Sequence, residues 1–136
     1  MKLLMLQAHD YWLKPFERSI RDAEENPASI SCRNAVVALV HVESIDELTP
    51  ENVIRKAIKN IKWHARKVAA QTVVLHSFAH LSPSKADAAT ARYILDRMAE
   101  RLANAGLTVQ LTPFGYFNEF KLHVAGPSIA KVFVEV

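Results

Sequence analysis

Two short blocks of polar and aromatic residues carry the chemistry that this sequence offers. The first, Phe78–Ser82, follows an apolar strand pattern over residues 72–76. The second, Pro113–Phe117, is a tight Pro/Gly turn between two further strand patterns. Residues at the ends of strands are where folds usually place binding and catalysis, so we expect both blocks to line a functional site.

Within the first block, His80 is the residue suited to orient a substrate or a water. The alternative is a histidine satisfied by neighbouring backbone groups. Ser82 and Ser84 fit helix caps better than nucleophiles, because no Gly-x-Ser-x-Gly turn surrounds them. Cys32 is the only cysteine and lacks a nucleophile signature. With scattered histidines and no Gly-rich phosphate loop, we expect no metal and no cofactor.

The second block combines a glycine with aromatic rings. Gly115 allows a positive φ or a close approach of a ligand to the backbone. The rings of Phe114, Tyr116 and Phe117 either stack on a nucleic-acid base or cap the core of a hairpin. On the strand that follows, Lys121 falls on the polar face, where it is catalytic or merely solvated.

Composition sets broad limits on the class of protein. The chain has 136 residues, is half apolar and carries a net charge of +3, which fits one globular domain over residues 1–136. This mild charge permits a polyanionic partner without demanding one. A single cysteine fits a reducing, cytoplasmic setting. The apolar run at residues 1–6 is too short to span a membrane, and we interpret it as a first strand.

The apolar patterns predict an α/β fold, a single domain with a mixed β-sheet and two long helices. One helix starts at Pro50, capped by Thr49, and runs to about Ala70. The other starts at residues 82–84 and ends at Asn104, before Gly106 in a left-handed cap. Residues 10–33 are predicted to be a loop. Strands are predicted over residues 2–7, 35–42, 72–76, 107–111, 117–124 and 131–136.

The first predicted helix carries a row of basic residues opposite its apolar face. These residues are Arg55, Lys59, Lys62 and Arg66, at spacings of four, three and four. Such a row could follow a phosphate backbone. The alternative is an ordinary solvated face, as most runs of charge are.

The two blocks resemble motifs of the N-terminal editing domain of archaeal threonyl-tRNA synthetases, and the resemblance covers nearly the whole chain. The family block Pro-Phe-Ala-His-Leu-Ser is met by residues 77–82, with Ser77 in place of proline. The family motif Pro-Phe-Gly-Tyr-Tyr-Lys-x-Phe-Lys is met by residues 113–121, with Phe117 for the second tyrosine and Asn118 for the first lysine.

The resemblance implies a D-aminoacyl-tRNA deacylase-like fold, a homodimer, and hydrolysis of L-seryl-tRNA(Thr) by a water that the 2′-hydroxyl of the terminal adenosine assists. It implies the acceptor end of tRNA(Thr) as partner, beside an attached or separate threonyl-tRNA synthetase catalytic region. A D-aminoacyl-tRNA deacylase and a non-catalytic tRNA-binding appendage remain alternatives. The implied substrate-binding residues are Val42, Ser77, Phe78, Ala79, Phe114, Gly115, Tyr116, Phe117 and Lys121.

Three residues are expected to be catalytic. His80 matches the family histidine that shapes the amino-acid pocket. Asn118 stands where the family has a lysine, and Lys131 stands where it has a glutamate after a Gly-His-Pro turn. We therefore expect Asn118 and Lys131 to line one pocket, with Lys131 supplying the charge that Asn118 lacks.

Overall fold

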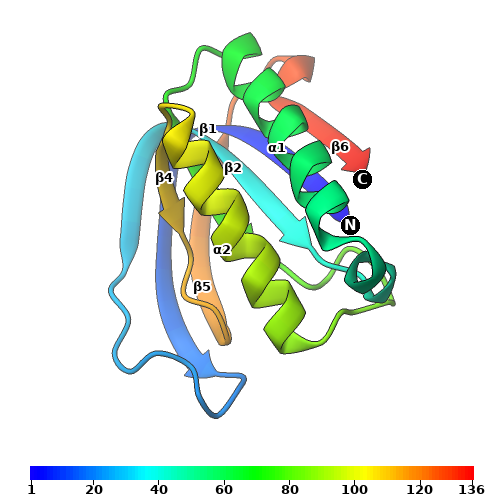
Figure 1. Ribbon diagram of the computed structural model, residues 1–136. Coiled ribbons are helices and arrows are strands. Elements are labelled where there is room, and N and C mark those ends of the chain that lie inside the picture. The colour runs from blue at the N-terminus through cyan, green and yellow to red at the C-terminus, as the bar shows by residue number, and fades with distance from the viewer.

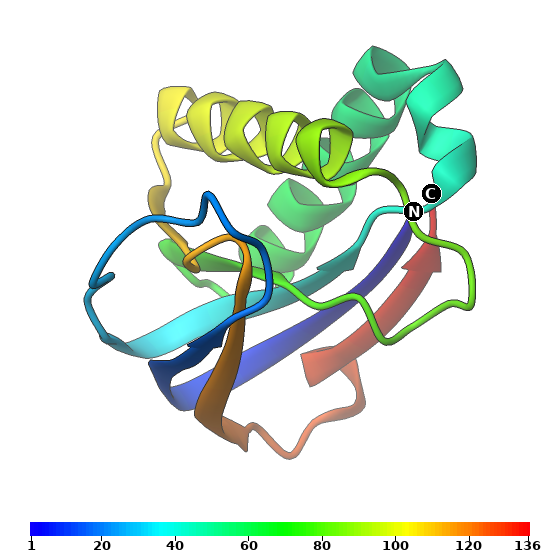
Figure 2. The ribbon, with the colours of Figure 1, turned by 90° about the horizontal axis from the view of Figure 1, so that it is seen from below.

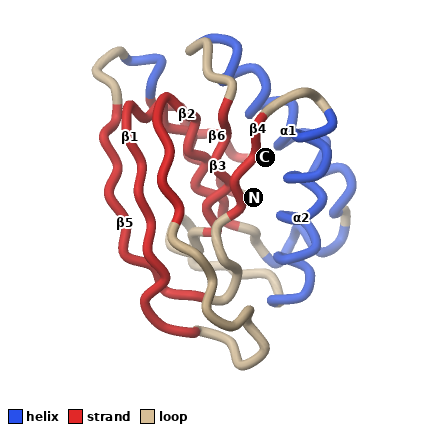
Figure 3. The backbone as a smooth tube through the Cα atoms, turned by 90° about the vertical axis from the view of Figure 1, so that its left-hand side faces the viewer, coloured by secondary structure: helices blue, strands red, loops and turns tan.

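A computed structural model describes all 136 residues. Six strands form one mixed sheet, and both long helices cover the same face of it (Figures 1 and 3). The strands are β1 Lys2–Arg18, β2 Ile30–His41, β3 Thr72–Ser77, β4 Thr108–Leu111, β5 Tyr116–Val124 and β6 Lys131–Glu135. The helices are α1 Pro50–Lys67 and α2 Ala88–Asn104, with short 3₁₀ helices η1 Ser44–Leu48 and η2 Ser128–Ala130. The predicted order of strands and long helices is confirmed.

The order of the strands brings the C-terminal ends of β2, β3 and β4 to one edge of the sheet. The sheet runs β4-β3-β2-β1-β5, and β6 pairs with the first part of β1. Strands β2, β3 and β4 are parallel, whereas β1 is antiparallel to β2, β5 and β6. Parallel strands end at the same edge, and in open α/β sheets this edge is where ligands bind. Neither helix is long and apolar enough to cross a membrane.

Strand β2 is apolar from Ala35 to Val40 because both of its faces are buried there. Val36, Ala38 and Val40 belong to the core beneath the helices. Val37 and Leu39 alternate with them and belong to a second core on the opposite face.

Helix α1 follows the predicted apolar stripe. Val53, Ile54, Ala57, Ile61 and Ala65 are buried against the sheet, as their spacing predicts. The helix ends at Lys67, three residues before the predicted end. The backbone turns there, with Ala69 at a φ of +55°.

The predicted loop over residues 10–33 is wrong at both ends. Strand β1 continues to Arg18, and β2 begins at Ile30. The register of β1 against β5 shifts between Ala8 and Asp10 and again between Pro15 and Glu17. Such bulges break the alternation of apolar and polar residues, which is why the pattern does not read as a strand.

The predicted start of the second helix is also wrong. Helix α2 begins at Ala88, where the Asp87 carboxylate accepts a hydrogen bond from the Thr90 N–H at 2.8 Å. The Ser82 hydroxyl instead donates to Glu43 Oε2 at 2.7 Å, and the Ser84 hydroxyl bonds to Ser44. The stretch before the helix, residues 78–87, is therefore an ordered loop, which we call the site loop.

Candidate functional site

A cavity of about 370 Å³ lies where β2, β3 and β4 end, and both sequence blocks line it. We call it the edge cavity. The predicted residues that line it are Val42, Ser77, Ala79, His80, Phe114, Gly115, Tyr116 and Phe117. Ser19, Ile20 and Lys85 line it too, although sequence patterns did not indicate them. The fold thus joins segments from four parts of the chain at one edge.

The Gly115 turn forms one wall of this cavity against the segment that follows β1. Gly115 has a φ of +83°, and a β-carbon there would lie 2.3 Å from Cγ1 of Ile20. The Ser19 N–H donates to the Gly115 carbonyl at 2.7 Å, and the Tyr116 hydroxyl donates to the Glu24 carbonyl. Figure 2 shows these two segments side by side. Gly115 is therefore required for this turn to lie close to Ile20 and Ala23 in the segment that follows β1.

The site loop forms the opposite wall and is fastened to the end of β2. The Phe78 N–H donates to the Val40 carbonyl at 2.9 Å, and the Ala86 N–H donates to the Val42 carbonyl at 3.1 Å. Between them, the buried imidazole of His41 bonds to the loop on both sides. The loop is thus held at both ends and at its middle.

Two backbone donors in this loop have no partner within the protein. The N–H groups of Ala79 and His80 make no hydrogen bond, whereas the flanking N–H groups of Phe78 and Leu81 are taken up by Val40 and His41. Adjacent free N–H groups beside a cavity can bind an oxyanion or a carbonyl oxygen.

The edge cavity is mostly apolar and contains no acidic side chain. Val40, Val42 and Ala91 contribute apolar surface, while Lys85 and His80 are the only basic side chains among the lining residues. Lys85 has no ion pair within the protein. Such a cavity favours a ligand that combines an apolar ring with neutral or anionic groups.

Other reactive side chains lie away from this cavity. Burial, with a smaller contribution from Asp10, raises the pKa of the Cys32 thiol, which disfavours a nucleophilic thiolate. No three His, Cys, Asp or Glu side chains converge as metal ligands do.

A comparison with protein families places these features in a known group. The archaea-specific editing domain of threonyl-tRNA synthetase matches residues 1–136. The chain belongs to this family. Its role is therefore in tRNA editing, and the resemblance stated from the two sequence blocks is confirmed.

Curated relatives agree with this assignment. The chain is 34% identical over 140 residues to the threonine–tRNA ligases of Thermococcus gammatolerans and Pyrococcus horikoshii. Each alignment covers 97% of this chain and 22% of the ligase, so the chain spans about a fifth of the length of these relatives.

A solved structure, the c-Myc DNA unwinding element binding protein, has the same fold, with a TM-score of 0.61 at 14% identity. The alignment covers 100% of this chain and 99% of that chain. The fold class is the predicted D-aminoacyl-tRNA deacylase-like one, a single α/β domain.

Two predicted substrate-binding residues of the editing domain do not line the edge cavity. The Phe78 ring packs into the second core against His76 and Phe120, with ring centroids 5.7 and 6.2 Å away. Lys121 is exposed on β5, opposite Trp12 of β1. The Phe78 side chain therefore supports the cavity wall from behind.

The prediction that Asn118 and Lys131 share a pocket is wrong. Lys131 pairs with Leu6 of β1 and Asn118 with Pro15, nine positions further along the strand, which corresponds to about 30 Å. The Lys131 ammonium donates to the carbonyls of Ala125 and Gly126 at 2.8 and 3.0 Å. It therefore stabilises the turn between β5 and β6.

Asn118 also lies outside the cavity lining. Its Nδ2 makes a long hydrogen bond of 3.4 Å to the Tyr116 carbonyl, and its buried Oδ1 has no partner. Neither Asn118 nor Lys131 therefore supplies a charge to the edge cavity. Lys85, which lines the edge cavity, was not predicted to be a site residue, because the second helix was expected to start before it.

A buried tyrosine–histidine pair lies behind the site loop. The Tyr11 hydroxyl donates to His76 Nδ1 at 2.9 Å, and both side chains are almost fully buried. Burial lowers the pKa of His76 to about 4 and raises the pKa of Tyr11. His76 is therefore neutral at physiological pH, and its Nδ1 accepts the hydrogen bond from the Tyr11 hydroxyl. Sequence alone gave no signal for this pair.

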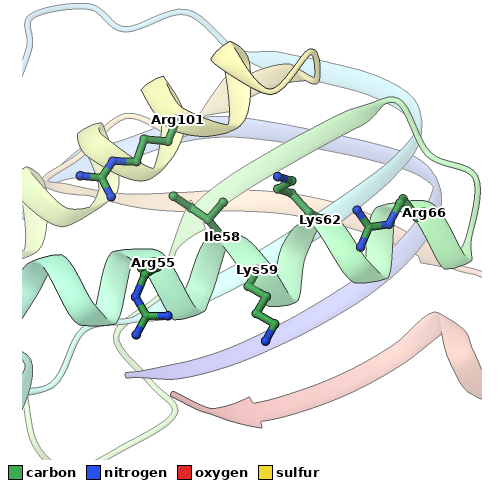
Figure 4. A pocket seen from close by; sticks show the side chains of 6 residues that line it. All are labelled: Arg55, Ile58, Lys59, Lys62, Arg66 and Arg101. Carbon is green, nitrogen blue, oxygen red and sulfur yellow. The ribbon is translucent and has the colours of Figure 1, made fainter.

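The predicted basic row lines a separate hollow of about 390 Å³ between α1 and α2. Arg55, Lys59, Lys62 and Arg66 come from α1, and α2 adds Arg101 (Figure 4). We call this hollow the α1–α2 groove. It shares no residue with the edge cavity.

Proposed function

We propose that this domain hydrolyses the ester of mischarged L-seryl-tRNA(Thr) in the edge cavity. The proposal rests on one observation above all: the two motif blocks of an editing-domain family line the same cavity, beside two unpaired backbone N–H groups. An ester is already activated, so positioning and electrostatic stabilisation can suffice without a nucleophilic side chain.

In the proposed complex, the terminal adenine lies against Val42 and the apolar surface beside it. The ester carbonyl oxygen accepts hydrogen bonds from the N–H groups of Ala79 and His80, which stabilise the charge that develops in the transition state. Tyr116, Phe114 and Phe117 bound the opposite side of the cavity. His80 and Ser77 orient the water and the seryl side chain.

The terminal 2′-hydroxyl assists the attacking water in this mechanism. The water oxygen adds to the carbonyl carbon, the bond to the ribose oxygen breaks, and that oxygen leaves with a proton. His80 is the only histidine that lines the cavity, and no carboxylate does. Seryl-tRNA ending in 2′-deoxyadenosine is therefore expected to react at least tenfold more slowly, or about 1.4 kcal/mol in barrier. An unchanged rate would shift the role of base to His80.

Rejecting threonine is the harder task for this cavity. One extra methyl group is worth only about 1–3 kcal/mol in a close-fitting pocket. Discrimination must therefore come from steric exclusion between His80 and Tyr116, which lie on opposite walls of the cavity, or from displacement of the attacking water.

A deacylation assay separates the candidate functions. We expect rapid release of serine from L-seryl-tRNA(Thr) and slow release of threonine from L-threonyl-tRNA(Thr). Preferential cleavage of a D-aminoacyl-tRNA would assign the chain as a D-aminoacyl-tRNA deacylase. Binding of tRNA without any cleavage would assign it as a non-catalytic appendage.

The functional context is proposed from the same family. The domain acts as a homodimer, next to a threonyl-tRNA synthetase catalytic region in the same chain or in another. Light scattering tests the homodimer. Adding the separate synthetase to the deacylation assay, with serine and ATP, tests whether seryl-tRNA is removed as it forms.

A further inference from the structure

We propose that the α1–α2 groove binds the phosphate backbone of the tRNA acceptor end upstream of the terminal adenosine. This inference rests on the proposed function, because it assigns a second contact for the same substrate. The groove lies apart from the edge cavity and contributes no group to the reaction.

The charges of the groove are largely uncompensated. Lys59, Lys62 and Arg66 have no ion pair within the protein, and Arg55 donates only to the neutral Asn52 amide at 2.6 Å. Arg101 is the exception, because it pairs with Glu51. A concentration of unpaired cations favours a ligand with several negative charges.

The groove has the shape of a track rather than of a point site. Arg55 and Arg66 are eleven residues apart on α1, which corresponds to about 16 Å along the helix. Ile58 forms an apolar floor between the cations, and Arg101 closes the groove from α2 (Figure 4). A neighbouring hollow that also contains Lys62 and Arg66 extends it to Gln71 and Leu107. A linear polyanion such as an RNA strand fits such a track.

Helix α2 connects the groove with the edge cavity. Ala91 lines the cavity and Arg101 lines the groove, so about 15 Å of helix separates them. A nucleoside in the cavity cannot span this distance, whereas the nucleotides before it in the strand can. The groove should therefore matter for long substrates and be irrelevant to a seryl-adenosine.

The test compares two pairs of lysines on the same helix. Lys59→Gln/Lys62→Gln removes two charges from the groove. Lys56→Gln/Lys67→Gln removes the same charge from exposed positions that do not line it. The probe is an RNA acceptor-stem microhelix that ends in CCA and carries no amino acid, so binding is measured independently of hydrolysis. We expect Kd to rise about tenfold in the groove variant, and the slope of log Kd against log salt to fall by about 1.5.

The control variant should bind nearly as wild type, and both variants should hydrolyse seryl-adenosine at the wild-type rate. Equal weakening by the two variants would overturn the groove as a specific contact.

Binding of polyglutamate as tight as that of the microhelix, with the same loss in the groove variant, would overturn RNA as its partner. A wild-type protein that binds the microhelix but hydrolyses no ester would refute the proposed function and leave the groove supported.

Discussion

His41 fastens Ser84 in place: its Nε2 donates to the Ser84 carbonyl at 2.6 Å. The same ring accepts a hydrogen bond from the Leu81 N–H at Nδ1, at 2.9 Å, which fixes the ring proton on Nε2. His41 lies on β2 between Val40 and Val42, both of which line the edge cavity. One buried side chain thus connects the strand that forms one wall with the loop that carries His80.

Removing this ring is expected to misplace the site loop. His41→Ala leaves the Leu81 N–H and the Ser84 carbonyl without partners, at about 1–3 kcal/mol each. We expect a lower unfolding temperature and a fall of at least tenfold in kcat for seryl-adenosine. His41→Gln keeps a donor for Ser84 and His41→Asn keeps an acceptor for Leu81, so each should restore part of kcat. Gln and Asn variants as slow as the Ala variant would show that these two bonds do not position the loop.

No hydroxyl or thiol is expected to act as a nucleophile. The Ser82 hydroxyl donates to Glu43 and accepts from the Ser84 N–H at 3.1 Å, so it holds the loop. The half-buried Cys32 thiol, whose pKa is raised, lies outside the cavity lining. Ser82→Ala and Cys32→Ala should each keep hydrolysis within about tenfold, or 1.4 kcal/mol in barrier. A covalent seryl-enzyme trapped by acid quench and seen by mass spectrometry would contradict this mechanism.

Patterns of local sequence were sufficient for some features and not for others. The continuous apolar run of β2 and the stripe of α1 identify buried elements because their periods are unbroken. The bulges of β1 hide its period, so its second half was predicted to be a loop. Both motif blocks line one cavity, because strand ends meet at one edge of a parallel sheet.

The distance between Asn118 and Lys131 could not be inferred in the same way. It depends on the pairing of β1, whose residues 2–6 pair with β6 and whose residues 8–18 pair with β5. This division of one strand between two partners is a property of the whole sheet. Lys85 was missed for a related reason: the Asp87 cap, which starts α2 later than expected, leaves that lysine in the site loop.

Replacing Lys131 should affect stability and leave hydrolysis unchanged. Its ammonium donates to carbonyls of the turn between β5 and β6, far from His80 in the sequence and outside the edge cavity. We expect Lys131→Met to lower the free energy of unfolding by about 1 kcal/mol, because the bonds are partly exposed. Denaturant titration and kcat/KM for seryl-adenosine measure the two effects. A tenfold loss of kcat/KM in a folded variant would return Lys131 to the site.

The buried His76 should make the stability of the domain depend on pH. Its pKa is about 4 in the folded protein, because burial disfavours the charged ring, against about 6.5 in the unfolded chain. Between these values the unfolded chain binds the proton, so stability is lost as pH falls from about 6.5 to about 4. We expect the free energy of unfolding to fall by about 2 kcal/mol between pH 7.5 and pH 5 from this residue alone. His76→Gln, which keeps an acceptor for the Tyr11 hydroxyl, should remove that part of the dependence. Urea titrations at both pH values, on both proteins, measure the difference, and equal pH dependence in the two would refute a neutral, buried His76.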